Sequence, residues 1–298
     1  MLGWRKMRAR WKTLGFASAF AAYSFCANAQ TFSWNWTGFY VGADAGFISS
    51  RSLSSTQATV PVPSSSSYLT AAPPFTNTLP IFNITGVDTL STRGTQLGVH
   101  AGYNWQLKPL AVGVEIDFSE FRTRGVRDTA YPLCITGCPS VSGVSFPTGI
   151  VSQLHSETST DWLFTVRPRV GWVYSVLYGY ITGGAAFTTI NASTLYTDSA
   201  NTRGFVSTSQ SKAGWVIGAG LEVAIAPRWT LRAEYLRVEF SGVTGASRIV
   251  NGALFNPINF SADHKSDMVR VGVSHKFQWW WEEPPPPVAP GPVVVTKD

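Results

Sequence analysis

The most constraining feature of this sequence is an alternation of apolar with polar or small residues that recurs eight times. In residues 96–105, one row consists of Leu97, Val99, Ala101, Tyr103 and Trp105, and the other contains only Gln, Gly, His and Asn. Side chains alternate between the two faces of a β-strand, so this pattern predicts a strand with one apolar face. Aromatic residues end the apolar row beside a short break, as they do at the rim of membrane-spanning barrel strands.

The connections between the expected strands alternate strictly between long and short. The expected strands are 36–48, 96–105, 111–121, 161–172, 177–188, 214–224, 230–240 and 267–277. The long connections are 49–93, 122–160, 189–213 and 241–265, and the short ones lie at Lys108-Pro109, Tyr174-Ser175 and Ala226-Pro227-Arg228. Outer-membrane barrels have long extracellular loops, short periplasmic turns and an even strand number. The sequence therefore predicts an all-β fold, an eight-stranded antiparallel transmembrane β-barrel with that arrangement of loops and turns.

Two positions are expected to disturb the strands. Pro168 removes a donor from the ladder, which predicts a bulge or local irregularity there. Beyond Leu236 the alternation loses its phase, which makes that region a second candidate for a bulge.

The first 29 residues have the pattern of a secretory signal peptide. A basic stretch, Arg5–Lys12, precedes the apolar run Leu14–Phe25, and Ala27-Asn28-Ala29 offers small residues for cleavage after Ala29. No stretch beyond it approaches the roughly twenty apolar residues of a membrane helix. The expected organisation is a signal peptide at 1–29, a barrel at 30–277 and a proline-rich periplasmic tail at 278–298, in the outer membrane of a Gram-negative cell.

The positive net charge of the chain resides mostly in this signal peptide. The chain has 23 Lys plus Arg and 17 Asp plus Glu, and residues 1–29 contribute five of the cations, which leaves 18 against 17. Binding of nucleic acid needs a concentrated basic patch, so nucleic acid is excluded as a partner.

The inward rows of the expected strands collect charges of both signs. The acids are Asp44, Glu115, Asp117, Glu222 and Glu234, and the bases are Arg167, Arg169, Arg232, Arg270 and Lys276. Unpaired charge is costly in a narrow lumen, so we expect paired networks, with Glu115 and Asp117 beside Arg167 and Arg169, and Glu234 beside Arg270. Two interpretations stay open, a salt-bridged plug and a charge-lined conduit. Eight strands leave an interior that side chains just fill, although the inward glycines leave room for a thin water path.

Residue types that carry catalysis are scattered. The histidines are His100, His155, His264 and His275, and no nucleophile motif or metal-ligand spacing accompanies them. Asp161, Asp263 and His264 lie near the expected rim, where such residues are usually solvated. We therefore predict no enzyme, no cofactor and no metal site. Cys134 and Cys138 lie in the second long loop, and an oxidising compartment favours a local disulfide over free thiols.

The residues after Phe277 change in character. Three tryptophans, Trp279–Trp281, precede two glutamates and the run Pro284–Pro287, a composition typical of an extended, unpacked segment. Either this tail is unstructured in the periplasm or it tethers the barrel to peptidoglycan or a periplasmic partner. Tryptophans of this kind suit a membrane interface.

Several segments resemble a known family in combination. They are residues 36–42 (WTGFYVG), 102–105 (GYNW), 113–117 (GVEID), 165–171 (TVRPRVG), 180–186 (YITGGAA), 214–222 (GWVIGAGLE), 232–236 (RAEYL) and 269–277 (VRVGVSHKF). Over residues 34–277 the chain resembles the small outer-membrane β-barrel family of alphaproteobacteria, the major surface-antigen or porin-like proteins, which are similar in fold to the transmembrane domain of OmpA.

The resemblance implies a role in envelope integrity and surface contact, with outer-membrane lipid as the surroundings. It also implies that Phe277 is the terminal aromatic residue that the barrel-assembly machinery reads, although here residues 278–298 follow it. The first loop is also unusually long for the family. A narrow solute channel is the alternative function, and binding of haem or a host ligand by the loops, implied by some relatives, is a weaker one.

Overall fold

The computed structural model describes residues 34–60, 83, 87–134, 140–141, 144–145, 150–199, 201–251 and 253–277. The predicted signal peptide and the predicted tail both lie outside the described residues. Among the residues described, no helix is long and apolar enough to cross a bilayer.

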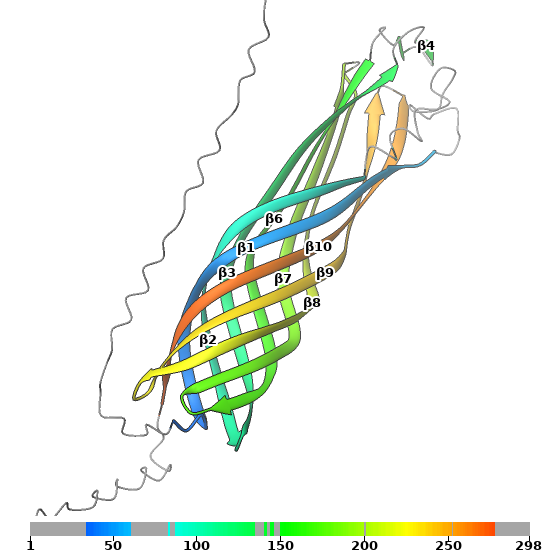
Figure 1. Ribbon diagram of the computed structural model, residues 1–298. Coiled ribbons are helices and arrows are strands. Elements are labelled where there is room, and N and C mark those ends of the chain that lie inside the picture. Colours follow the sequence, from blue (N-terminus) through cyan, green and yellow to red (C-terminus); the bar gives the residue numbers. More distant parts are fainter. Residues whose placement is uncertain are drawn as a thin grey trace, which may run out of the picture. The chain divides into compact units, whose positions relative to one another are not determined.

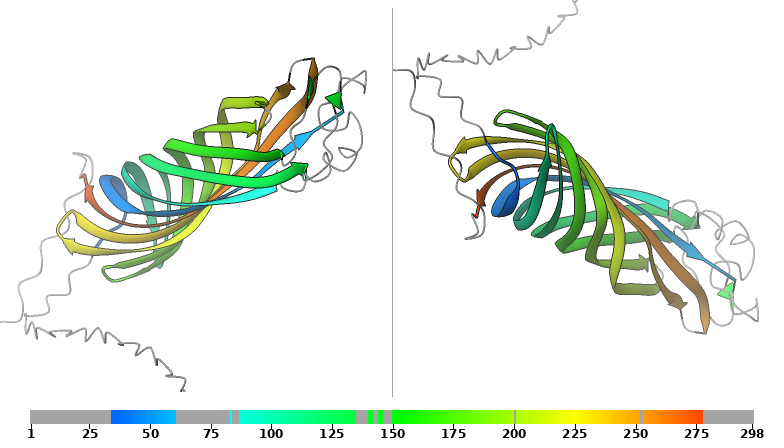
Figure 2. Two further views of the ribbon diagram at one scale, coloured as in Figure 1. Left: turned by 90° about the horizontal axis from the view of Figure 1, so that it is seen from above. Right: turned by 90° about the horizontal axis from the view of Figure 1, so that it is seen from below.

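Eight long antiparallel strands close into a barrel (Figure 1). They are β1 (Gly38–Ala58), β2 (Val87–Leu107), β3 (Leu110–Cys134), β6 (Ile150–Tyr174), β7 (Leu177–Asp198), β8 (Arg203–Ala226), β9 (Trp229–Asn251) and β10 (Leu254–Lys276). The order around the ring is β1-β10-β9-β8-β7-β6-β3-β2, and β1 pairs with β10 from Tyr40↔Lys276 to Ala58↔Ile258. Two short strands, β4 (Ser140–Val141) and β5 (Val144–Ser145), pair separately. The views of Figure 2 show the strands winding around one ring.

The outward faces carry the predicted apolar rows between two girdles of aromatic side chains. At the end with the short turns, the exposed aromatic residues are Trp105, Trp172, Tyr174, Trp229 and Phe277. The second girdle contains Phe47, Phe118, Phe187, Trp215 and Tyr235. Along β1, the eight residue steps from Phe39 to Phe47 rise about 26 Å, or about 20 Å across a sheet tilted by roughly 40°. This height is close to that of the apolar band of membrane barrels.

The strands continue well past the second girdle, so the loops of the barrel are shorter than the sequence predicts. β1 extends to Ala58 and β2 begins at Val87, so both ends of the first predicted loop are strand. β7 and β8 are separated only by residues 199–202, and β9 and β10 only by 252–253. We call these parts of the strands, beyond the second girdle, the distal extension. With 21–25 residues each, the strands are about twice the 9–11 residues that cross a bilayer.

The apolar face changes sides where the distal extension begins. On β9, Leu231 and Tyr235 face outward, whereas Leu236, Val238 and Phe240 are buried inside. Further apolar residues fill the interior of the distal extension, among them Leu154, Ile190, Tyr196, Val206, Val243, Ile249, Ile258 and Phe260. In the apolar band the apolar residues of each strand face outward, and in the distal extension they face inward. The alternation therefore changes phase near the second girdle, which explains why the predicted strands end there.

The distal extension is split into two facing sheets. Pairs between β2 and β3 end at Thr95↔Arg122, and pairs between β8 and β9 stop at Trp215↔Glu239, resuming only at Arg203↔Val250 and Gly204↔Ile249. One sheet therefore contains β3, β6, β7 and β8, the other β9, β10, β1 and β2, and the two groups diverge in Figure 1. Across the gap between β8 and β9, a side-chain hydrogen bond takes the place of backbone pairing. Nε2 of Gln210 donates to Thr244 O at 2.6 Å.

The two expected irregularities have different outcomes. At Pro168 the register between β6 and β7 does not shift, since Val166↔Ala185 and Arg169↔Thr182 share one alignment, although residues 167 and 168 make no ladder pair with β7. The register shift in this pair of strands lies between Thr160 and Phe164. Beyond Leu236, the register of β9 and β10 shifts between Ala262 and His264, opposite Gly242, whose φ is 74°.

Candidate functional site

The candidate site is the middle of the barrel interior, where charged side chains from six strands meet. Each of these side chains is at most 3% exposed: Asp44, Glu115, Asp117, Arg167, Arg169, Glu222, Arg232, Glu234 and Arg270. All nine point inward because they alternate along their strands with the exposed apolar residues, and successive residues of a strand face opposite sides. We call this set the charge network.

Glu115 lies at the centre of one half of the charge network. Its Oε1 lies 2.6 Å from Nη2 of Arg167, and its Oε2 lies 3.0 Å from Nη1 of Arg169 and 2.8 Å from Nη1 of Arg232. The Tyr40 hydroxyl donates a further hydrogen bond to Oε2 at 2.8 Å. One carboxylate thus contacts three guanidinium groups from two strands within 3.0 Å, and Nη2 of Arg270 lies 3.8 Å from its Oε1. This arrangement offsets the large cost of burying each charge.

Arg270 is the centre of the other half. Its Nη1 lies 3.1 Å from Asp44 Oδ1 and 2.5 Å from Asp117 Oδ2, and its Nη2 lies 2.6 Å from Glu234 Oε2. The structure therefore places Glu115 beside Arg167 and Glu234 beside Arg270, as the adjacent strands suggested. Asp117 instead reaches across the lumen to Arg270, because its position on β3 is opposite Thr165 of β6.

Aromatic rings surround Arg169. Its guanidinium carbon lies 4.7 Å from the ring centres of Tyr40 and Tyr180 and 5.3 Å from that of Tyr178. It also forms an ion pair with Glu222 at 2.9 Å. Desolvated cation–π contacts contribute on the order of 2 kcal/mol, so the tyrosines hold this cation in place as well as filling space.

Large neighbouring side chains occupy the space above three of the inward glycines. A Cβ at Gly102 would lie 2.2 Å from the Tyr40 hydroxyl, and one at Gly220 would lie 2.6 Å from Cζ of Tyr180. A Cβ at Gly42 would lie 2.3 Å from Nε2 of His100. The glycines are sites of close approach by large side chains.

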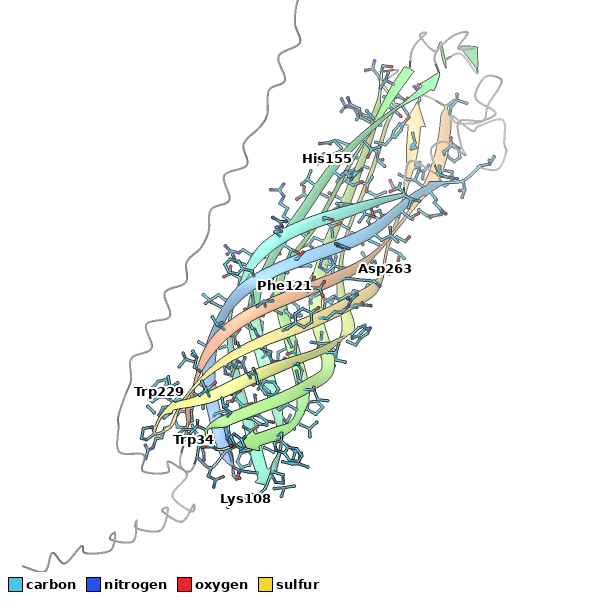
Figure 3. All side chains as sticks on the ribbon, viewed as in Figure 1. Trp34, Lys108, Phe121, His155, Trp229 and Asp263 are labelled. Carbon is cyan, nitrogen blue, oxygen red and sulfur yellow. The ribbon has the colours of Figure 1, made fainter. Side chains whose placement is uncertain are left out.

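Apolar layers lie on both sides of the charge network. Toward the short turns, Trp34 and Trp36 are buried in the barrel mouth, and the Trp36 ring lies 5.2 Å from that of Tyr178. Toward the distal extension, Ile48, Phe121, Leu163, Leu236 and Met268 are buried inside. In Figure 3, Trp34 lies at the same end as Lys108 and Trp229, whereas Asp263 and His155 lie toward the distal extension.

Two predicted residues of β10 and its end lie at the rim of the barrel. Lys276 was expected in the interior, but its Nζ donates to Asn35 O at 2.7 Å in an exposed position, so it does not join the charge network. The Phe277 N–H donates to Phe39 O at 2.8 Å, and its ring lies 5.8 Å from that of Phe39. Cys138 lies outside the described residues, and of Cys134 only the backbone, at the end of β3, is described.

The polar residues expected near the rim do not assemble. His264 is 2% exposed and faces the interior, whereas its neighbour Asp263 faces outward and accepts a hydrogen bond from the Gly242 N–H. Asp161 lies on β6, which is not adjacent to β10 in the ring. In the described part of the chain, no group of three or more His, Cys, Asp or Glu side chains has the arrangement of a metal site.

Several residues of the site were not singled out from the sequence. They are Tyr40, Gln96, His100, Asn104, Tyr178 and Tyr180, all of which touch the charge network. Tyr40 lies opposite Gly102 and Tyr180 opposite Gly220 in neighbouring strands. An inward aromatic residue facing an inward glycine is the signal that could have identified them, but reading it requires the strand register.

A closed antiparallel ring with an apolar outer band, two aromatic girdles and a charged interior defines a membrane β-barrel. Residues 17–277 match the family described as outer membrane protein beta-barrel domain. The chain is 31% identical over 255 residues to the 31 kDa outer-membrane immunogenic proteins of Brucella melitensis and Brucella suis, covering 84% of this chain and 87% of either relative. The chain therefore belongs to the outer-membrane β-barrel family of alphaproteobacteria.

Similarity to solved structures is more distant. The outer membrane protease OmpT from Escherichia coli has 9% sequence identity and a TM-score of 0.41, with 83% of this chain and 100% of that chain covered. OprG from Pseudomonas aeruginosa has 12% identity and a TM-score of 0.39, with 82% and 98% covered. With the family shown, the predicted fold class and outer-membrane location are confirmed, and the protein is similar to surface antigens.

Proposed function

We propose that this protein is a closed, non-catalytic barrel that supports envelope integrity as a rigid membrane anchor. Its distal extension and the loops beyond it would then be the surface for contacts outside the cell. Strand length supports this division, because roughly half of each strand lies beyond the apolar band.

The observation that carries the proposal is the filled lumen. Arg167, Arg232 and Arg270 are among the largest fully buried side chains of the chain, and each is held by two or more carboxylates. At the mouth, the cavity lined by Trp34, Trp36 and Tyr40 measures about 10 Å³, room for about one water molecule. Solute passage would require several buried ion pairs to separate, and each separation would leave uncompensated charges in the lumen.

Single-channel recording in planar bilayers tests the proposal. We expect no steady conductance from the purified, folded protein. The variant Tyr40→Ala/Tyr180→Ala, which empties the space above Gly102 and Gly220, serves as the sensitivity control, and brief conductance is expected from it. Steady openings of the unaltered protein that change with Glu115→Gln or Arg167→Gln would instead establish the narrow channel. No observation on the described residues specifically favours binding of haem.

A further inference from the structure

We propose that the outer face of β10, β1, β2 and β3 binds a phosphorylated lipid of the outer leaflet. One acyl chain would lie in an apolar groove, and the phosphate would contact arginines directly beyond it. This assigns a specific lipid site to one side of the barrel and is independent of whether the lumen conducts.

The groove lies on the apolar band just below the second girdle. Its volume is about 540 Å³, and the side chains that form its apolar part are those of Ala45, Phe47, Leu97, Val269 and Val271. These residues come from three adjacent strands, and Phe47 is 75% and Leu97 62% exposed. Ala45 lies between Leu97 and Val271 in the register, and its small side chain leaves the depression between larger neighbours.

Cations lie at the distal end of this groove. Arg122 lines it, opposite Thr95 of β2. Arg93 is two residues beyond Thr95 on the same face, about 7 Å along the strand. Arg51 is four residues beyond Phe47, about 13 Å along β1, and it pairs in the register with Lys265 of β10. The four side chains therefore project outward at the level where lipid headgroups follow the apolar band.

Two of these cations differ from the other charged residues at this level. Arg122 is paired with Glu120, Arg124 with Glu157 at 2.6 Å, and Lys265 with Glu239 at 3.5 Å. Within the part of the chain that the structure describes, Arg51 and Arg93 have no carboxylate within ion-pair distance. Both are exposed, so an anionic group arriving from outside would meet two uncompensated guanidinium groups.

The combination indicates the class of ligand. A guanidinium group binds phosphate by charge and by paired hydrogen bonds, and an exposed apolar groove takes an alkyl chain. A water-soluble polyanion would use the arginines and leave the groove empty, and a neutral lipid would use only the groove. A lipid with a phosphorylated headgroup uses both, and the outer leaflet presents it in the required orientation, with chains toward the bilayer and phosphate toward the distal extension.

Native mass spectrometry on the full-length barrel released from nanodiscs tests the site. The nanodiscs contain phosphatidylcholine with 5% of either bisphosphorylated lipid A or its dephosphorylated form. We expect retention of the phosphorylated lipid, and at least a tenfold loss of affinity in Arg51→Gln/Arg93→Gln. Ala45→Trp, which fills the groove from outside the folded core, should weaken binding by a similar factor.

The control variant is Arg203→Gln/Arg248→Gln, which removes the same charge from exposed positions near the tip of β8 and β9. It should bind as the unaltered protein does, and heat-modifiable gel mobility should show that all variants fold. Equal retention of the two lipids, or unchanged binding in Arg51→Gln/Arg93→Gln, would overturn the phosphate contact. Unchanged binding in Ala45→Trp would overturn the proposed place of the acyl chain.

Discussion

At the scale of single residues, Glu115 is the carboxylate on which most of the charge network depends. Glu115→Gln keeps the size of the side chain but removes the charge shared by Arg167, Arg169 and Arg232. Breaking buried ion pairs from one side leaves uncompensated cations, so we expect a loss of about 3–5 kcal/mol in the free energy of unfolding. The shift of the urea midpoint in detergent micelles measures it.

Glu120→Gln on the same strand is the matched control. Glu120 faces outward, is 43% exposed at its side chain and pairs with Arg122 on the surface. Exposed pairs contribute less than about 1 kcal/mol, so this variant should unfold close to the unaltered protein. Equal losses in both variants would contradict a central role for Glu115.

A second prediction concerns the close approach of Tyr40 to Gly102. In Gly102→Ala, the added methyl group would lie 2.2 Å from the Tyr40 hydroxyl and 2.6 Å from Val114 O, and the backbone oxygen cannot move freely. We expect a cost of about 1–3 kcal/mol from overpacking. Gly183→Ala is the control, because its nearest contact would be an ordinary 3.4 Å to Val216 O. Comparison of the fractions folded on heat-modifiable gels distinguishes the two.

His264 predicts a dependence of stability on pH. It lies in the distal extension, five residues beyond Val269, with Phe240 and Ser52 opposite it and its Nε2 3.0 Å from Ser266 Oγ. Desolvation by burial lowers the pKa of His264 from 6.5 to about 4. Between those values the unfolded chain binds the proton and the folded protein does not, so stability should fall as pH drops from 6.5 toward 4. The full loss in the free energy of unfolding is roughly 3 kcal/mol.

Urea midpoints measured between pH 4 and pH 8 test this contribution. The urea midpoint of the unaltered protein should fall between pH 6.5 and pH 4, and the contribution of His264 should be constant above pH 6.5. His264→Asn should remove most of the fall between pH 6.5 and pH 4. His155→Asn, which changes a histidine on the outer surface, should not alter it. An unchanged slope in His264→Asn would assign the pH dependence to other groups.

At the scale of the strands, the change of the apolar face from outside to inside decides what a substitution does. Val271 and Val250 are both exposed, at 59% and 41%, but Val271 lies in the apolar band and Val250 in the distal extension. Val271→Lys should cost about 2–4 kcal/mol because the charge faces lipid. Val250→Lys should stay within about 0.5 kcal/mol because it faces water. Urea midpoints in phospholipid bilayers report both, and a similar cost for the two would mean that the band extends to Val250.

The same change of sides explains what the sequence could and could not predict. In the band, period-two alternation identified every strand, all nine residues of the charge network and the short turns, because lipid demands a uniform apolar face there. It also placed Lys276 inside, whereas this residue lies at the exposed rim. Beyond Phe47 the outward residues meet water, and serine and threonine on both faces of β1 hide the strand. Ion pairs between adjacent strands, such as Glu115 with Arg167, followed from order alone. Contacts across the lumen, such as Asp117 with Arg270, depend on register and closure, which no local pattern encodes.

At the scale of the whole molecule, closure of the ring places the short turns at one end and the distal extension at the other. If the distal extension lies outside the cell, a cysteine at exposed position 246 of β9 should react with a membrane-impermeant maleimide on intact cells. One at position 108, in the turn between β2 and β3, should react only after lysis. The substitutions Ala246→Cys and Lys108→Cys are made together with Cys134→Ser and Cys138→Ser, so that the introduced cysteine does not compete with these two native thiols. Labelling of position 108 on intact cells would reverse the topology and would place the proposed lipid site in the inner leaflet, where lipids meet the barrel with the opposite orientation.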